Sequence, residues 1–250
     1  MIEQEMRGDV AVITLNRPRK LNAWDTPARE AFRVALAEAD TDARVKAVVV
    51  TGAGDKAFCA GADLRESGIG VPGDSRERMN RFLGLYEGVL SFRKPLVAAL
   101  NGLAVGSAFQ VVLMMDHRVG HAGVQMGLAE INSGIPTISG ATILNWAVGL
   151  NRTREISVSG RMIPAAESLA LGLIDELVAP KDVMPRSLEV AQRLATKSPL
   201  AYAETKAWLR DLRFPELRAA FERAYEIRQR KELATAIQSG VAGFNAKAPA

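Results

Sequence analysis

The residues best suited to chemistry lie in one stretch of the sequence, residues 97–130. A short apolar strand over residues 96–100 meets a glycine-bearing turn, and Gly106-Ser107 then opens an apolar helix. The first N–H groups of a helix have no partner within it, and they carry the positive end of the helix dipole. Such a terminus binds anions, and it forms an oxyanion hole when the anion exists only in a transition state.

Strand, helix and strand are expected upstream of this turn. Residues 10–15 form an apolar, β-branched run that is typical of a strand. Thr26 followed by Pro27 favours an N-cap at Thr26, and apolar residues then recur at helical spacing as far as Ala39. Residues 46–51 predict a buried second strand, so the unit implies a right-handed crossover.

The rest of the chain is expected to alternate loops, helices and short strands. Residues 65–81 carry glycines and a proline among charges, which predicts a mobile loop and a candidate lid over a site. The helical region from residue 181 onward is expected to form an appendage. The other expected elements are helices over 79–91, 141–148, 152–159 and 165–171, strands over 117–120 and 174–178, and helix breaks at Pro199 and Pro215.

Composition excludes several classes of protein. The 250 residues are 48% hydrophobic and carry a formal net charge of +4, which suits an anionic ligand without requiring one. The single cysteine, Cys59, rules out an intramolecular disulfide and fits a reducing cytoplasm, and no Cys/His cluster offers a metal site. We expect no secretion, membrane span or nucleic-acid binding, because signal peptide, uninterrupted apolar stretch and arginine-rich tract are all missing.

A glycine pattern at Gly52, Gly54 and Ala57 matches a dinucleotide-binding fingerprint. That fingerprint requires an amphipathic helix directly after it, whereas residues 58–64 are small and interrupted by glycine. We therefore reject a dinucleotide site here.

Several short motifs follow one another along the chain. They are Ala-Phe-Cys-Ala-Gly-Ala-Asp-Leu at 57–64, Lys94-Pro95 leading to Asn101-Gly102 and Gly106-Ser107, and Met-Gly-Leu-Ala-Glu at 126–130, with further matches at 16–18, 21–23, 160–161, 165–167 and 172–175. Together they resemble the signatures of the crotonase superfamily, the enoyl-CoA hydratase/isomerase family. The resemblance implies an α/β fold with a crotonase-like ββα spiral core at residues 1–195 and a C-terminal helical trimerisation region at 196–250. It also implies a homotrimer or a dimer of trimers.

The resemblance further implies an acyl-CoA thioester as substrate, with coenzyme A as part of that substrate, no separate cofactor and no metal. The thioester oxygen would lie between the backbone N–H groups of Ala62 and Ser107, each of which can stabilise an enolate-like transition state by about 3 kcal/mol. The acyl pocket would draw on Trp24, residues 79–83 and the segment after Gly134. The residues expected to contact the coenzyme are Arg19, Lys20, Leu21, Ala23, Ala60 and Asp63.

The same resemblance implies that Glu130 is the general acid/base. Hydratases of this family have a second glutamate on the helix after the second oxyanion residue, but this chain has Gln110 there. An amide cannot take up or deliver a proton at neutral pH, whereas one carboxylate suffices to move a proton between two carbons. The sequence therefore favours double-bond isomerisation.

Other functions stay open at this point. Gln110 could orient a water molecule for enoyl-CoA hydration, or the chain could hydrolyse or decarboxylate a specialised acyl-CoA. It could also bind acyl-CoA without catalysis. Asp63 is expected to hold its own loop, and Cys59 to be a small buried hydrophobe. Residues 134–137 lack the glycine-rich continuation common in hydratases, so the sequence does not name the acyl group.

Overall fold

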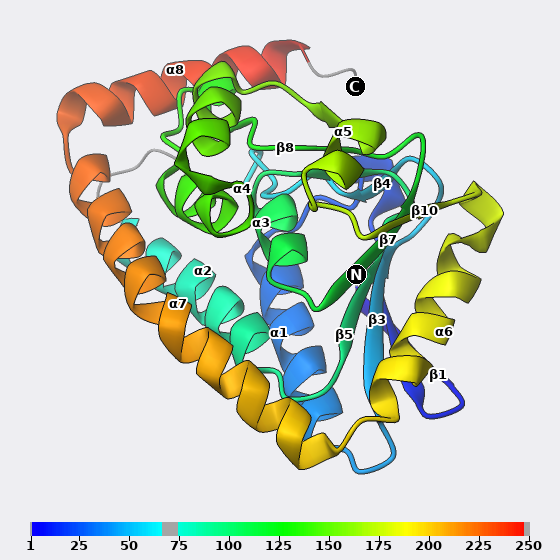
Figure 1. Cartoon of the computed structure of the whole chain (residues 1–250). Helices are drawn as coiled ribbons and strands as arrows, with labels where there is room; N and C mark the ends of the chain where they lie inside the picture. The colour runs from blue at the N-terminus through cyan, green and yellow to red at the C-terminus, as the bar shows by residue number, and fades with distance from the viewer. Residues whose placement is uncertain (1, 67–74, 248–250) are drawn as a thin grey trace.

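The computed structural model describes residues 2–66 and 75–247. Figure 1 shows a layered α/β arrangement with helices on both sides of a sheet. Residues 67–74 of the expected loop at 65–81 lie outside the described residues. From Ser75 onward the chain is helical, so the helix begins earlier than the predicted start at residue 79. No helix within the described ranges is long and apolar enough to cross a membrane.

The larger sheet crosses the centre of the molecule. Its first two strands are antiparallel, and every following pair of neighbours is parallel. Parallel neighbours require crossover connections, which the helices between the strands supply. In spatial order the strands are β1 (Ile2–Arg7), β2 (Val10–Leu15), β3 (Ala47–Gly52), β5 (Leu96–Ala99), β7 (His117–His121) and β10 (Glu176–Val178).

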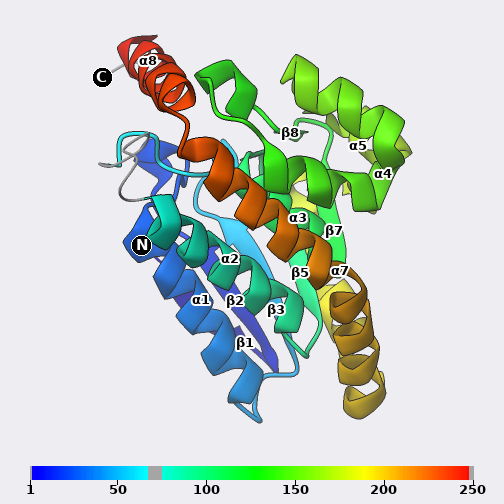
Figure 2. The same ribbon diagram turned by 90° about the vertical axis from the view of Figure 1, so that its left-hand side faces the viewer.

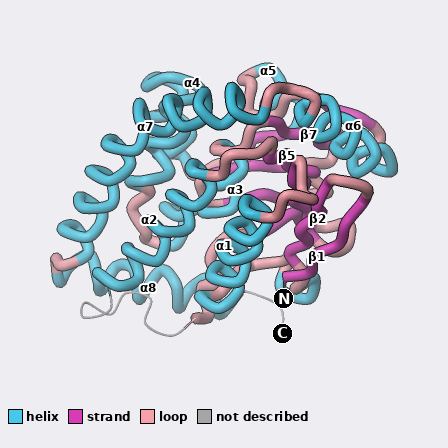
Figure 3. Tube along the Cα trace, turned by 90° about the horizontal axis from the view of Figure 1, so that it is seen from below, coloured by secondary structure: helices cyan, strands magenta, loops and turns pink. Residues whose placement is uncertain are grey.

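Figure 3 shows the helices in cyan on both sides of the strands, while β1 lies at an open edge. Between them lie short 3₁₀ turns. The bounds are α1 (Thr26–Thr41), α2 (Ser75–Ser91), α3 (Ser107–Leu113), α4 (Ile138–Ser159), α5 (Ala165–Ala170), α6 (Val183–Ala195), α7 (Pro199–Arg228), α8 (Lys231–Lys247), η1 (Pro18–Lys20), η3 (Glu130–Ser133) and η4 (Pro180–Asp182).

Alternation of side chains along each strand gives the larger sheet two apolar faces. Val10 and Val12 of β2 pack in a cluster with α6, whereas Ala11 and Ile13 of the same strand belong to the main core on the opposite face. Figure 2 shows α1, α2 and α7 side by side over that opposite face. Both faces are therefore covered, as the near-continuous apolar runs of a parallel sheet require.

A smaller sheet carries the segments singled out by the sequence motifs. Its strands, in spatial order, are β4 (Ala57–Cys59), β6 (Leu103–Val105), β8 (Gln125–Gly127) and β9 (Ile163–Pro164). β6 pairs in parallel with β4 on one side and with β8 on the other, so the carboxyl ends of these three strands meet at one edge of the sheet. The residues that follow these three ends are those of the Ala62 loop, the Gly106 turn and Glu130.

The start of α1 differs from the prediction. The N-cap is Asp25, which accepts a hydrogen bond from the Ala28 N–H at 3.0 Å, so an N-cap at Thr26 is wrong. Thr26 lies in the first turn and donates its own N–H to Glu66 Oε1 at 2.7 Å. The N–H of Thr26, the residue that the sequence pattern predicted as the N-cap, is therefore satisfied by the carboxylate of Glu66, which is distant in the sequence.

The C-terminal helices also differ from the prediction in where they are interrupted. A helix does begin at Pro199, but Pro215 lies inside α7 and does not end it. Proline cannot donate to the carbonyl of residue 211, so the helix continues through Pro215 without that hydrogen bond. The predicted helices on either side of Gly149 are joined in α4, where Gly149 forms a kink at φ +73°.

The helical C-terminal region packs closely on the rest of the chain. Leu217 and Phe221 of α7 are buried in the main core, and α7 lies against α2 and α4. Ile237 and Val241 of α8 pack beside η3. A domain boundary at residue 195 stays a prediction.

Candidate active site

A cavity of about 920 Å³ opens at the edge where β4, β6 and β8 end. The ten residues that the sequence analysis assigned to the oxyanion site, to acid/base catalysis and to coenzyme binding all line this one cavity, although they come from four separate parts of the chain. The role of each residue stays a prediction. These lining residues are Arg19, Lys20, Leu21, Ala23, Ala60, Ala62, Asp63, Ser107, Gln110 and Glu130.

Two glycines bring the backbone of Ala62 close to that of Ser107. Gly61 has φ +86°, and a Cβ there would lie 2.5 Å from the Val105 carbonyl oxygen and 3.4 Å from the Ser107 nitrogen. Gly106 has φ +58° and precedes the first residue of α3. Only glycine permits this close approach of two backbone segments in these conformations.

The N–H groups of Ala62 and Ser107 are free to bind an anion. Ala62 pairs with Trp24 in an isolated parallel bridge, whose hydrogen bonds use the carbonyl of Gly61 and the N–H of Asp63. Ser107 is the first residue of α3, so its N–H has no partner within the helix. In the described part of the chain, neither N–H donates a backbone hydrogen bond.

Trp24 lies behind this pair of donors and not in the acyl pocket. It is 1% exposed and is absent from the cavity lining, so the expectation that it contacts the acyl group is wrong. Its indole Nε1 donates a hydrogen bond of 2.9 Å to Ser107 Oγ. The Ser107 hydroxyl thus faces the core, which leaves the backbone N–H as its contribution to the cavity.

Gln110 and Glu130 are linked by a directed network of hydrogen bonds. The Gln110 carbonyl oxygen accepts from Tyr86 Oη at 2.8 Å and from Ser139 Oγ at 3.1 Å. These donors orient the amide so that Nε2 donates to Glu130 Oε1 at 2.8 Å. Gly140 of α4 allows this packing, because a Cβ there would lie 2.9 Å from Gln110 Nε2.

The second carboxylate oxygen of Glu130 is not engaged in this network. Oε2 is buried and has no hydrogen-bond partner among the described residues. Burial raises the pKa of Glu130 to about 7, while the hydrogen bond from Gln110 opposes that rise. A carboxyl group that titrates near neutral pH can both accept and return a proton.

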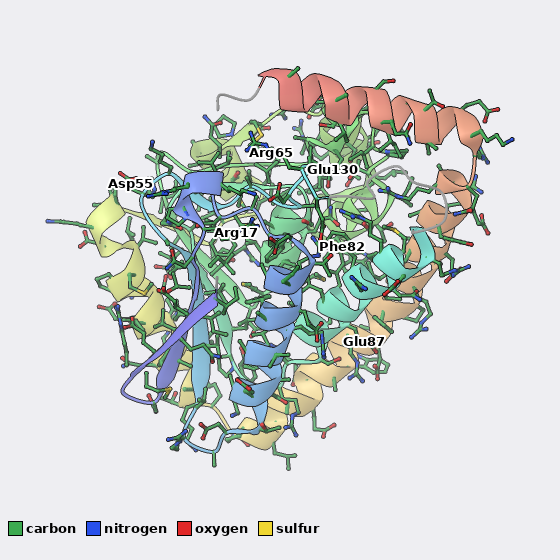
Figure 4. All side chains as sticks on the ribbon, turned by 180° about the vertical axis from the view of Figure 1, so that it is seen from behind. Arg17, Asp55, Arg65, Phe82, Glu87 and Glu130 are labelled. Atoms are coloured by element: carbon green, nitrogen blue, oxygen red, sulfur yellow. The ribbon has the colours of Figure 1, made fainter. Side chains whose placement is uncertain are left out.

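The cavity also holds basic side chains near the Asp63 loop. Asp63 accepts hydrogen bonds from Arg17 at 3.2 Å, Lys20 at 3.1 Å and the Arg65 N–H at 3.1 Å, so it ties η1 to its own loop. Figure 4 labels Arg17, Arg65 and Glu130 among the side chains of this part of the molecule. Lys20 is therefore already paired, whereas no ion pair of Arg19 is found among the described residues.

Other chemistries find little support at this site. Burial raises the pKa of the Cys59 thiol to about 12, and Cys59 is fully buried, so it is a core residue rather than a nucleophile. Across the described ranges, no three His, Cys, Asp or Glu side chains are grouped so that they could hold a metal ion.

Comparison with known proteins places the chain in a family. The sequence profile described as enoyl-CoA hydratase/isomerase matches residues 5–250. This chain belongs to the enoyl-CoA hydratase/isomerase family. A probable enoyl-CoA hydratase of Rhizobium meliloti is 36% identical, covering 97% of this chain and 94% of the relative. A short-chain-enoyl-CoA hydratase of Clostridium acetobutylicum is 32% identical, covering 81% of this chain and 78% of the relative.

Solved structures support the same assignment. An enoyl-CoA hydratase of Mycobacterium avium subsp. paratuberculosis superposes with a TM-score of 0.86 at 25% identity, covering 98% of this chain and 96% of that chain. The crotonase-like α/β fold expected from the motifs is confirmed, and the chain is an enzyme of the enoyl-CoA hydratase/isomerase family.

Sequence reasoning missed several residues of this family member's cavity. Tyr86 lies in the helix predicted over 79–91, and a buried phenol needs a hydrogen-bond partner, so a buried position for Tyr86 would have indicated a polar neighbour. Ser139 carries no signal in the sequence. Arg228 gives a stronger one, since it follows Phe221 and Ala224 at helical spacing and places a cation on an apolar face.

Proposed function

We propose that this protein moves the double bond of an enoyl-CoA thioester, with Glu130 as the single acid/base. The names of the relatives support an acyl-CoA substrate. The observation that carries the proposal is the environment of Glu130: Oε1 is held by the Gln110 amide, and Oε2 is left buried and unpartnered beside the oxyanion donors.

Each step follows from the chain's own groups. With the thioester oxygen bound by the Ala62 and Ser107 N–H groups, Glu130 takes a proton from the α-carbon of a β,γ-enoyl thioester. The electron pair moves toward the carbonyl, and the two N–H groups stabilise the negative charge on oxygen. Glu130 then returns the proton to the γ-carbon, so the double bond shifts to the α,β position and the atoms balance.

Gln110 takes no proton in this scheme. Its amide is committed at both ends, because the carbonyl oxygen accepts from Tyr86 and the nitrogen donates to Glu130. It therefore positions the Glu130 carboxylate, and we infer that the site contains one proton-transfer group where a pair of carboxylates would assist the addition of water.

Enoyl-CoA hydration is the second candidate, because both relatives named above are called hydratases. In that reaction Glu130 would activate a water molecule and then deliver a proton to the α-carbon. A chain that only binds acyl-CoA would show neither reaction.

One experiment separates these functions. Crotonyl-CoA and a 3-enoyl-CoA are incubated in deuterated water or in heavy-oxygen water, with the wild type and with Glu130→Gln, and the products are analysed by mass spectrometry. Deuterium uptake with double-bond migration and no added oxygen, lost in Glu130→Gln, is the expected result. Incorporation of heavy oxygen would instead establish hydration, and thioester binding without turnover would overturn both reactions.

We also propose that the protein assembles as a homotrimer or a dimer of trimers. The first half of α7 exposes large apolar side chains of the kind that interfaces cover. They are Leu200 (72% exposed), Trp208 (64%), Leu209 (56%) and Leu212 (49%).

A further inference from the structure

An unpaired cation lies in the wall of the cavity, on the face of α7 that points into the protein. Phe221 and Ala224 are buried and line the cavity, and Arg228 follows them on the same helical face. Among the described residues, no hydrogen bond or ion pair to its guanidinium is found. Its position in the last turn of α7 is favourable for a cation, but the helix dipole does not satisfy its N–H donors.

The neighbouring charges do not neutralise this cation. Arg78 of α2 also lines the cavity and shares a single carboxylate, Glu66, with Arg29. Both guanidinium groups lie 3.2 Å from Glu66 Oε2, so one negative charge serves two positive ones. Glu130 is the other nearby acid, and it is only partly ionised at neutral pH. The wall formed by Arg78 and Arg228 therefore has an excess of positive charge.

Arg228 lines the same cavity as Glu130, and the two side chains interact electrostatically. Burial and the charge of Arg78 lower its pKa to about 10, while Glu130 acts in the opposite direction. Arg228 thus stands within electrostatic range of Glu130 and of Arg78, and Arg78 in turn pairs with Glu66 at 3.2 Å. If Arg19 and Lys20 bind the coenzyme and Glu130 acts beside the thioester, a wall that interacts with Glu130 faces the acyl group and not the phosphates.

We propose that Arg228, with Arg78 beside it, binds a carboxylate at the far end of the acyl group, so the substrates are CoA thioesters of dicarboxylic acids. This inference rests on the proposed acyl-CoA function. A guanidinium presents paired N–H donors that match a carboxylate, and a partly buried pair of this kind is favoured over an unpaired cation. A neutral acyl chain would leave Arg228 unpaired, which is how the site would discriminate against it.

Binding of unreactive saturated thioesters tests this directly. Glutaryl-CoA and pentanoyl-CoA have acyl chains of equal carbon number that differ in the terminal carboxylate, and free CoA reports the contribution of the coenzyme. By isothermal titration calorimetry we expect the wild type to bind glutaryl-CoA at least about tenfold more tightly than pentanoyl-CoA. Because no turnover is involved, this result does not depend on which reaction the enzyme catalyses.

Variants on α7 assign the effect to one residue. Arg228→Met is expected to abolish the preference for glutaryl-CoA and to leave the Kd values of pentanoyl-CoA and free CoA within about twofold of wild type. Arg223→Met, which removes an exposed arginine that pairs with Glu226 on the same helix, should preserve the preference. The proposal fails if wild type shows no preference, or if Arg228→Met weakens all three ligands equally, which would assign Arg228 to a coenzyme phosphate. Failure of all three ligands to bind would instead overturn the acyl-CoA function itself.

Discussion

The Gln110 side-chain amide donates a hydrogen bond of 2.8 Å to Glu130 Oε1 and leaves Glu130 Oε2 without a partner in the described structure. One oxygen of the carboxyl group is thereby held in place while the other remains available for proton transfer. The hydrogen bond favours the charged form of Glu130, and burial favours the neutral form. Because burial is the larger effect, the carboxyl group is poised near neutral pH.

The first prediction concerns the pH dependence of isomerisation. Glu130 must be ionised to accept the first proton, so kcat/KM is expected to rise as pH increases through about 7 and then to level off. In Gln110→Leu the Glu130 carboxylate loses the hydrogen bond from the Gln110 amide, so the pKa of Glu130 rises further. The rising part of the profile of kcat/KM against pH then moves to higher pH. Initial rates from about pH 5 to about pH 9 check this. If the rising part of the pH profile of Gln110→Leu stays where it is in the wild type, or moves to lower pH, the role given to Gln110 is contradicted.

The second prediction is that Glu130→Gln stabilises the folded protein at alkaline pH. The folded-state pKa of about 7 exceeds the ordinary value of 4.5, so the stabilising contribution of Glu130 is complete below about pH 4.5 and is lost as pH rises through 7. Above that pH the wild type carries a buried carboxylate that the variant lacks, worth at most about 3 kcal/mol. Urea unfolding of both proteins at about pH 5 and about pH 8.5 measures the difference, which must grow with pH. An equal difference at both pH values would refute the prediction.

Much of the site could be predicted because its backbone parts lie in contiguous motifs. The Ala62 loop, the Gly106 turn and Glu130 each follow a short strand, and parallel pairing of β4, β6 and β8 brings them to one edge. The glycine turn before α3 was predicted from local sequence, whereas none of these three short strands was. The sequence itself did not show which strands pair. Only the family resemblance implied a fold that brings these segments together.

The parts that escaped prediction depend on contacts between distant segments. Tyr86 and Ser139 reach Gln110 from α2 and α4, and neither residue type implies that partner. Local pattern favoured Thr26 as a cap, but Asp25 fills that position. The charge of Arg228 could be read from the sequence, yet its lack of a partner is a property of the folded cavity. Strand β1 went unpredicted because it is an exposed edge strand with mostly polar residues.

The third prediction distinguishes Arg19 from Lys20 in coenzyme binding. Both line the cavity, but Lys20 is paired with Asp63 at 3.1 Å. Arg19→Gln is therefore expected to raise KM for an acyl-CoA several-fold with little change in kcat, and to reduce the salt dependence of binding. Lys20→Gln should have the smaller effect on KM. Kinetics at low and high salt check both variants, and a larger effect of Lys20→Gln would show that the ligand displaces Asp63 from its lysine.

The fourth prediction concerns assembly through the apolar side of α7. Trp208 is 64% exposed, and Leu212 on the next turn is 49% exposed. Trp208→Glu places a charge in this surface and is expected to dissociate the oligomer without unfolding the chain, since the residue makes no contribution to the buried core. Light scattering coupled to gel filtration measures the mass, and circular dichroism confirms folding. Wild-type protein that elutes as a monomer would exclude the proposed trimer.

The fifth prediction isolates the Ser107 N–H. Ser107→Ala and Ser107→Pro both remove the hydroxyl that accepts from Trp24 Nε1, so they share that structural loss. Only the proline variant also removes the backbone donor, and proline suits the first position of a helix, which Ser107 occupies in α3. We expect kcat of Ser107→Pro to fall about 10²- to 10³-fold below that of Ser107→Ala, with similar KM and similar affinity for free CoA. Matching thermal melting curves would show that the two variants are equally folded. Equal kcat values would mean that the Ser107 N–H does not stabilise the enolate, and the oxyanion site would have to be sought elsewhere along the cavity.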